Sequence, residues 1–179
     1  MQSITIVSID FNHAKHEADL VELLDRYASG PSGRGYGLEP HVKQHIGPLL
    51  ASQSHYRGWL AYRNEEALGL VNAFLGVSSF RAKLLLNIHD ICVHPQAQHQ
   101  GIGTALLEHV ETAAISEGCC KITLEVLQGN QAAVGAYLKA GFKPYQLDPQ
   151  MGNPCGSQTQ TQSVTYNNCV APNILLIQP

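Results

Sequence analysis

Residues 88–107 read IHDICVHPQAQHQGIGTALL, and they show a strand, a loop and the start of a helix in succession. The apolar run from Leu84 to Val93, with Pro95 just beyond it, predicts a central strand buried on both faces. The glycine-containing segment 98–104 then opens a helix. Because a helix N-terminus presents unpaired N–H groups and glycines let the backbone approach an anion, this turn predicts a pyrophosphate site.

Glycine-rich turns of this kind occur in several families, so the spacing has to discriminate between them. A Rossmann fingerprint would need a small residue where Leu106 stands, and the P-loop pattern GxxxxGK[ST] is absent. The spacing Gln98-x-x-Gly101-x-Gly103 instead resembles the Q/R-x-x-G-x-G/A pyrophosphate loop of the GNAT acetyltransferase superfamily. The preceding segment 90–95 is similar to the fourth strand of that family.

A second motif lies downstream. Residues 130–142 read NQAAVGAYLKAGF and resemble the family pattern N-x-x-A-x-x-x-Y-x-x-x-G-F. The matching positions are Asn130, Ala133, Tyr137, Gly141 and Phe142. The resemblance is close over residues 84–147, rests on element order before that, and does not extend into the tail after Pro149.

The resemblance implies an α/β fold with a central mixed, mostly antiparallel sheet of six to seven strands. Strands four and five splay apart, and about four helices flank the sheet. This GNAT domain would cover residues 1–148, followed by an atypical polar tail over 149–179. In that tail, segment 152–168 shows little periodicity and 174–177 resembles a final edge strand.

The pattern along the chain predicts the elements. Helices are expected over 12–28, capped by Asp10 or Asn12, and over 38–52, 101–117 with Gly118 ending it, and 130–140. Strands are expected over 1–10, 56–63, 67–77, 84–93, 121–127 and 142–147, with a hairpin turn at 64–66. The alternation of strand and helix after residue 84 predicts parallel pairing through crossover connections.

The family's cosubstrate is acetyl-CoA, and the resemblance assigns residues to it. Backbone groups of Ile91, Cys92 and Val93 would pair with the pantetheine arm, and the N–H of Cys92 or Val93 would polarise the thioester carbonyl. Tyr137 would protonate the leaving thiolate, and Asn130 would contact the cofactor. The pyrophosphate would be held by Gln98, His99, Gln100, Gly101, Ile102, Gly103 and Thr104.

The acceptor amine must lose a proton, because a lysine-like ammonium has a pKa of about 10. Glu125 is one candidate base, since Thr123 and Glu125 share the face of their strand opposite to the apolar residues. It also resembles a glutamate used by family members that acetylate peptide N-termini. His89 is the second candidate, standing where polyamine-type members have an acidic residue. Asp90 is the third, and a water chain is the remaining alternative.

Composition excludes several function classes. The 179 residues suit one domain, with 44% hydrophobic and 14% charged residues. A net charge of -3 without a basic cluster argues against nucleic-acid binding. No run of about 18 apolar residues and no secretory signal is evident, which predicts a cytoplasmic protein without a membrane partner. Five cysteines without zinc spacing, and His41 and His45 without a third ligand, predict no metal.

The acceptor's identity is open at this stage. The glycine-rich loop 30–37, predicted to be mobile, would contribute to acceptor recognition, and Arg34 would suit an acceptor that bears a carboxylate. The expected acceptor is the amine of a small molecule or peptide. The alternatives are a non-catalytic acyl-CoA-binding sensor and a transferase of longer acyl chains. An unpaired final strand could pair with a second chain and form a homodimer.

Overall fold

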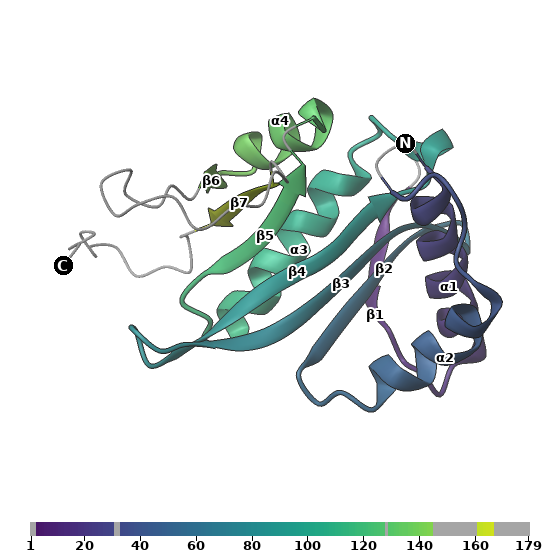
Figure 1. The fold of residues 1–179 in the computed structure, drawn as a ribbon, viewed down its shortest axis with the longest axis horizontal. Coiled ribbons are helices and arrows are strands. Elements are labelled where there is room, and N and C mark those ends of the chain that lie inside the picture. Colours follow the sequence, from purple (N-terminus) through teal and green to yellow (C-terminus); the bar gives the residue numbers. More distant parts are fainter. Residues whose placement is uncertain (1–2, 31–32, 128, 145–160, 167–179) are drawn as a thin grey trace.

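A computed structural model describes residues 3–30, 33–127, 129–144 and 161–166 of the chain. The described strands form one mixed sheet in the order β1-β2-β3-β4-β5-β7-β6, drawn in Figure 1. The strands are β1 (Thr5–Ser8), β2 (Tyr56–Arg63), β3 (Glu66–Ser78), β4 (Lys83–Val93), β5 (Ile122–Leu127), β6 (Lys143–Pro144) and β7 (Thr161–Tyr166). The helices are α1 (Ala14–Ser29), α2 (Pro40–Ala51), α3 (Ile102–Ser116) and α4 (Gln131–Lys139). The expected α/β fold is confirmed, and only the β4–β5 pair is parallel among the described strands.

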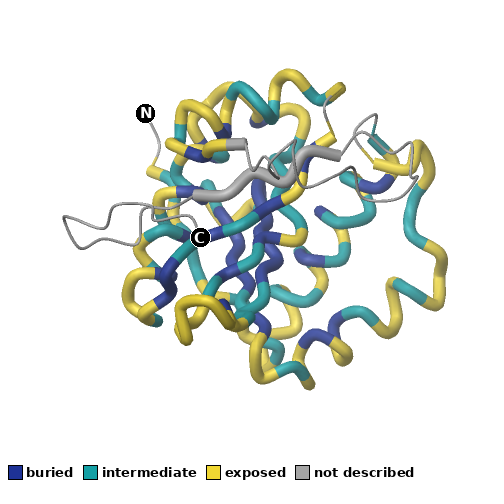
Figure 2. The backbone as a smooth tube through the Cα atoms, turned by 60° about the vertical axis from the view of Figure 1, so that its left-hand side comes forward, coloured by how far each residue is buried: buried dark blue, intermediate teal, exposed yellow. Residues whose placement is uncertain are grey.

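The helices cover the two faces of the sheet in pairs. On one face, α1 and α2 pack Leu20, Leu23 and Leu50 against strands β2 and β3. On the other face, α3 packs Leu106 and Val110, among others, against the sheet, and α4 joins the same cluster. Figure 2 shows buried residues concentrated along the middle of the sheet between these layers. The core therefore has two halves, separated by the sheet.

The start of α1 differs from the expectation. Its N-cap is His13, which makes no side-chain capping bond, so capping by Asp10 or Asn12 was wrong. The Asp10 carboxylate instead accepts a 2.9 Å hydrogen bond from the backbone N–H of Asn12 and closes a turn before the helix. The helical periodicity itself, with Leu20, Leu23 and Ala28 buried, is confirmed.

The hairpin between β2 and β3 is tighter than expected. Its turn has two residues, Asn64 and Glu65, with φ values of 49° and 65°, where segment 64–66 was expected to form the connection. Positive φ at both central residues is the geometry of a two-residue hairpin turn whose twist matches the strands.

Strand β4 is not buried on both faces as expected. Leu86 and Ile88 are buried against α3 and its neighbours, but His89 is exposed. The apolar run fills one face of the sheet, whereas α1 covers the other face of β4 only in part. On that open side, Asn87 Nδ2 donates a 2.8 Å hydrogen bond to Thr123 Oγ1 of β5.

A bulge in β4 marks the point where the parallel pair separates. β4 pairs with β5 only through residues 86–88 and 122–124. The register with β3 then shifts, because Ala73 pairs with Ile88 while Asn72 pairs with Asp90, which leaves His89 as the extra residue. The expected splay of the fourth and fifth strands is thereby confirmed, and Figure 1 shows β4 and β5 diverging. The part of β4 at residues 91–93, which has no described partner strand on the β5 side, borders what is called the gap below.

The C-terminal part departs most from the expectation. The crossover through α3 makes β4 and β5 parallel as predicted, but the strand after α4, β6, is not β5's neighbour. β7 lies between them and pairs antiparallel with both, within a polar segment that had been predicted to lack regular structure. The expected strand at 142–147 is described only at its start, and the one at 174–177 lies outside the described residues.

Candidate active site

The N-terminus of α3 faces the end of β4 and is shaped for an anion. Gly101 is its N-cap with φ of 84°, and His99 before it has φ of 60°. The first turn of α3 contains no acidic residue. The N–H groups of the first turn lack intrahelical acceptors and carry the positive end of the helix dipole. The predicted glycine-containing turn at the start of a helix is therefore confirmed, and its role as a pyrophosphate site stays a prediction.

Side chains around this turn hold it in place. Gln98 Nε2 donates to the Val93 carbonyl at 3.4 Å, and Gln100 Nε2 donates to the Gln96 carbonyl at 2.9 Å. From the end of β2, Arg63 Nη1 donates to Gln100 Oε1 at 2.6 Å. Arg63 thus places a positive charge beside a loop that has no basic residue between positions 95 and 104, apart from its histidine.

Beyond residue 88, the backbone of β4 has no partner strand on its β5 side among the described residues, although the Val93 carbonyl accepts the hydrogen bond from Gln98. His94 N–H donates to the Leu68 carbonyl at 2.8 Å, and bonding alternates along an antiparallel pair. Cys92 therefore directs its backbone groups toward β3, whereas Ile91 and Val93 direct theirs toward the gap. A ligand arm in the gap could pair with these two residues as a strand would.

Tyr137 on α4 is buried in the core half that α3 covers. Its side chain is 9% exposed, and its ring centroid lies 5.8 Å from that of Phe142. Burial raises the pKa of Tyr137 to about 12, and the nearby Tyr27 and Cys92 add to the rise. Asn130, the start of the same motif, caps α4, because its Oδ1 accepts a 3.1 Å hydrogen bond from Ala133 N–H.

Tyr137 interacts electrostatically with groups on the other face of the sheet, because Tyr27 and Cys92 both contribute to its raised pKa. Tyr137 belongs to the core half covered by α3, whereas Cys92 packs against the half covered by α1. The pKa of Tyr27 on α1 is raised mainly by burial, and the nearby Asp90 and Cys92 add to the rise. Sequence analysis missed Tyr27, since nothing in the helical pattern of α1 distinguishes it from a packing residue.

Cys92 is a poor nucleophile in this environment. Burial raises the pKa of its thiol to about 12, and the charge of Asp90 acts in the same direction. A thiol at this pKa is almost entirely protonated near pH 7, and the thiolate is the reactive form. The site is therefore suited to direct transfer rather than to an acyl-cysteine.

The three candidate bases, Glu125, His89 and Asp90, lie on the α1 side of the sheet. Glu125 is exposed on the face opposite to buried Leu124 and Val126, as the alternation predicted. His89 is exposed at the bulge, with its ring 5.3 Å from the Phe74 ring at an interplanar angle of 85°. The structure places both on the same face as Asp90.

A buried amide connects Asp90 to the interior. Asn72, only 2% exposed, donates from Nδ2 to Asp90 Oδ2 at 3.1 Å. Its own Oδ1 accepts a 2.8 Å hydrogen bond from the Tyr56 hydroxyl. Sequence analysis missed this pair, although an asparagine inside the apolar run LVNAF at residues 70–74 was a usable signal.

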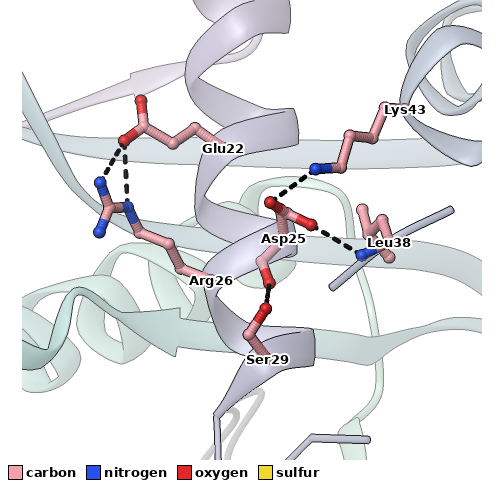
Figure 3. Close-up of polar contacts among 6 residues, drawn as sticks. All are labelled: Glu22, Asp25, Arg26, Ser29, Leu38 and Lys43. Carbon is pink, nitrogen blue, oxygen red and sulfur yellow. Dashed lines mark hydrogen bonds and ion pairs between the residues drawn. The ribbon is translucent and has the colours of Figure 1, made fainter. Parts of the chain in front are cut away.

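The connection between α1 and α2 is anchored by Asp25, as Figure 3 shows. Its carboxylate accepts 2.7 Å hydrogen bonds from Leu38 N–H and Lys43 Nζ. These contacts lower the pKa of Asp25, with Lys43 the larger cause. The described part of the glycine-rich loop is also tied to α1, since the N–H groups of Arg34 and Gly35 donate to the Ala28 carbonyl.

Three other features of the described structure concern ligands and membranes. A groove of about 530 Å³ runs along α1 and α2, but its lining contains no residue of β4 or β5. Among the residues that the structure describes, no cluster of three or more His, Cys, Asp or Glu side chains could hold a metal ion. No described helix has the length and apolar character needed to cross a membrane.

The fold and the site define the class of protein: an α/β domain with a splayed parallel pair and an open helix N-terminus beside it, as in N-acetyltransferases. Residues 18–142 match the model of the "Acetyltransferase (GNAT) family". The chain belongs to this family.

Known proteins similar to this chain include acetyltransferases of different amines. A 50-residue segment is 42% identical to thialysine N-epsilon-acetyltransferase of Mus musculus, covering 28% of this chain and 29% of that protein. A 55-residue segment is 40% identical to [ribosomal protein bS18]-alanine N-acetyltransferase of Escherichia coli, covering 31% and 37%. The matched segments thus span about a third of these relatives.

Solved structures agree with the fold. The crystal structure of the ribosomal-protein-S18-alanine N-acetyltransferase from Escherichia coli has a TM-score of 0.67 and 18% identity, covering 98% of this chain and 100% of that one. Arabidopsis thaliana Naa50, in complex with a bisubstrate analogue, has a TM-score of 0.62 and 19% identity, covering 91% and 97%. At such identities the likeness shows the fold alone.

Proposed function

We propose that the protein is an acetyl-CoA-dependent N-acetyltransferase that acts on the primary amine of a small molecule or peptide. The observation that supports this is the end of β4–β5 pairing at residue 88, which leaves the N–H groups of Ile91 and Val93 without a partner strand among the described residues, beside a helix α3 that begins at Gly101. Tyr137 lies near this part of β4, since Cys92 contributes to its raised pKa. Transfer would be direct, within a ternary complex, because Cys92 is held as a neutral thiol.

The residues present fit acetyl-CoA, which supplies the activated acyl group. N–H groups in the segment from Gln98 to Thr104 would hold the pyrophosphate, and Arg63 would add a positive charge nearby. Ile91 and Val93 would pair with the pantetheine arm. Of the two N–H groups expected to polarise the carbonyl, that of Val93 is favoured, since the backbone of Cys92 is directed toward β3.

The remaining residues would move protons. Tyr137 is neutral at physiological pH and would donate its hydroxyl proton to the leaving sulfur. Glu125 or His89 would take the proton of the acceptor, directly or through water. A pH–rate profile of Glu125→Gln and His89→Ala separates the two, because the true base determines the acidic limb. If both variants keep the wild-type limb, Asp90 or water is the base.

The function can be tested with a defined set of amines, called here the acceptor panel: thialysine, spermidine and a hexapeptide with an N-terminal alanine. The first and last follow the relatives' names. Calorimetry should show binding of CoA and acetyl-CoA, and free-thiol release should show turnover of at least one amine. Binding without turnover of any amine would instead indicate an acyl-CoA sensor. Longer acyl-CoAs in the same assay determine the acyl preference.

A further inference from the structure

Asp90 is a carboxylate fixed on one side and open on the other. Asn72 donates to its Oδ2, and Oδ1 accepts no hydrogen bond from the residues that the structure describes. No described Lys, Arg or His forms an ion pair with it. Its charge nevertheless acts on Tyr27, Tyr56 and Cys92 around it. A carboxylate held by one hydrogen bond and open at its second oxygen can accept a charge-assisted hydrogen bond from a cationic ligand.

The support behind Asp90 extends to a third strand. Tyr56 on β2 is 9% exposed, and its hydroxyl donates to Asn72. In the series of hydrogen bonds from Tyr56 through Asn72 to Asp90, Tyr56 and Asn72 are therefore buried and only Asp90 is partly open to solvent. Gly58 pairs with Asn72 in the register of β2 and β3, and a Cβ at Gly58 would lie 2.0 Å from the Tyr56 hydroxyl oxygen. The hydroxyl therefore occupies space that only a glycine leaves open.

The position of Asp90 relates it to the reaction. It follows the bulge residue His89 and precedes Ile91, whose backbone borders the gap. Its face of the sheet is the one covered by α1, opposite to the core half that contains Tyr137. An amine approaching the gap from the α1 side would pass this carboxylate.

We propose that Asp90, positioned by Asn72 and Tyr56, is the docking group for the ammonium form of the acceptor. This rests on the proposed N-acetyltransferase function and narrows its substrates to amines that are charged near pH 7, such as alkylamines and peptide N-termini. Asn72 and Tyr56 are positioning residues, since they act through the carboxylate. The ammonium donates to Asp90 on binding, before its proton is taken by the base.

The test compares Asp90→Asn, Tyr56→Phe and Asn72→Leu with wild type on the acceptor panel. A charge-assisted hydrogen bond predicts that Asp90→Asn raises the KM of the amine roughly 10- to 100-fold. Tyr56→Phe should raise it by a smaller factor, and the Kd of CoA should stay unchanged in both. The inhibition constant of the N-acetylated product should also stay unchanged, because its nitrogen is neutral. If Asp90 only stabilised the fold, its substitution would change the KM of the amine, the Kd of CoA and the inhibition constant of the product together.

Asp19→Asn is the matched control. Asp19 is a partly buried carboxylate on α1 that accepts a hydrogen bond from Tyr62, so its loss changes charge and packing without touching the gap. It should leave the KM of the amine unchanged. If Asn72→Leu does not bind CoA, the variant is misfolded, and the inference is then judged on Asp90→Asn and Tyr56→Phe. An amine KM within twofold of wild type in Asp90→Asn overturns the inference alone, whereas wild-type protein that acetylates no panel amine overturns the proposed function as well.

Discussion

At the scale of single residues, Tyr137 connects burial with proton transfer. Its pKa is raised to about 12 because the side chain is buried on α4. A raised pKa means that the protonated form, which an acid needs, persists to higher pH than for a free tyrosine near 10. The same burial that fills the core thus keeps the proton donor ready.

Tyr137→Phe should lower kcat by roughly 100-fold, the usual effect of losing a general acid. In the pH–rate profile of the wild type, ionisation of Tyr137 should cause no fall in kcat below pH 10, because burial raises the pKa of its hydroxyl to about 12. Steady-state profiles of wild type and variant should therefore have the same shape. A basic limb below pH 10 that disappears in Tyr137→Phe would contradict this assignment.

Substituting two glycines separates the effect of backbone strain from the effect of lost contact with the cofactor. Gly101 and Gly118 both have positive φ, 84° and 71°, and a Cβ at either would meet no atom within 4 Å. Alanine at each should cost about 1–2 kcal/mol of unfolding free energy in denaturant titrations. Only Gly101→Ala should also raise the Kd of acetyl-CoA, because only Gly101 opens the helix beside the gap. Equal Kd values in the two variants would exclude the turn as the pyrophosphate site.

At the scale of elements, the bulge in β4 explains which amides are free. Before His89, β4 is bonded on both sides; after it, the side toward β5 has no partner strand among the described residues. The alternation then directs the N–H groups of Ile91 and Val93 into the gap and that of Cys92 toward β3.

Hydrogen exchange can measure this difference directly. Adding acetyl-CoA should slow exchange at Ile91 and Val93, because these amides gain an acceptor only when the pantetheine arm is present. Cys92 should change little, since its amide is already bonded within the sheet. Residues 86–88, paired with β5 in either state, serve as the internal reference. Protection confined to Cys92 would show that the alternation has been assigned the wrong way round.

The same elements show how far the sequence could predict the fold and the site. The two motifs specified α3, β4 and α4, because glycines and an apolar run dictate local conformation there. The bulge at His89 and the insertion of β7 depend on pairing between distant strands, which no local pattern encodes. Tyr27 and Asn72 were missed for the same reason, since their roles exist only where separate elements meet. The functions of all the expected site residues, those of Tyr137 and of segments 91–93 and 98–104 as well as those of Glu125, His89 and Asn130, stay predictions.

At the scale of the whole molecule, the gap joins two core halves that otherwise lie on opposite faces of the sheet. A ligand in the gap would contact β4, the α3 N-terminus and Tyr137 together. Because it would bind the folded chain and not the unfolded one, it should stabilise the fold by about 2.7 kcal/mol at a hundredfold excess over Kd. For a domain of this size, each kcal/mol raises Tm by roughly 2–4 °C.

Acetyl-CoA at that excess should therefore raise Tm by roughly 5–11 °C in a thermal shift assay. Adenosine 3′-phosphate 5′-diphosphate keeps the pyrophosphate but has no pantetheine arm, so it cannot pair with Ile91 and Val93 and should give a distinctly smaller shift at equal concentration. The difference between the two ligands measures the contribution of the gap, as distinct from that of the helix terminus. Equal shifts would mean that the arm is not held between β4 and β5, even if the phosphates are bound at Gly101.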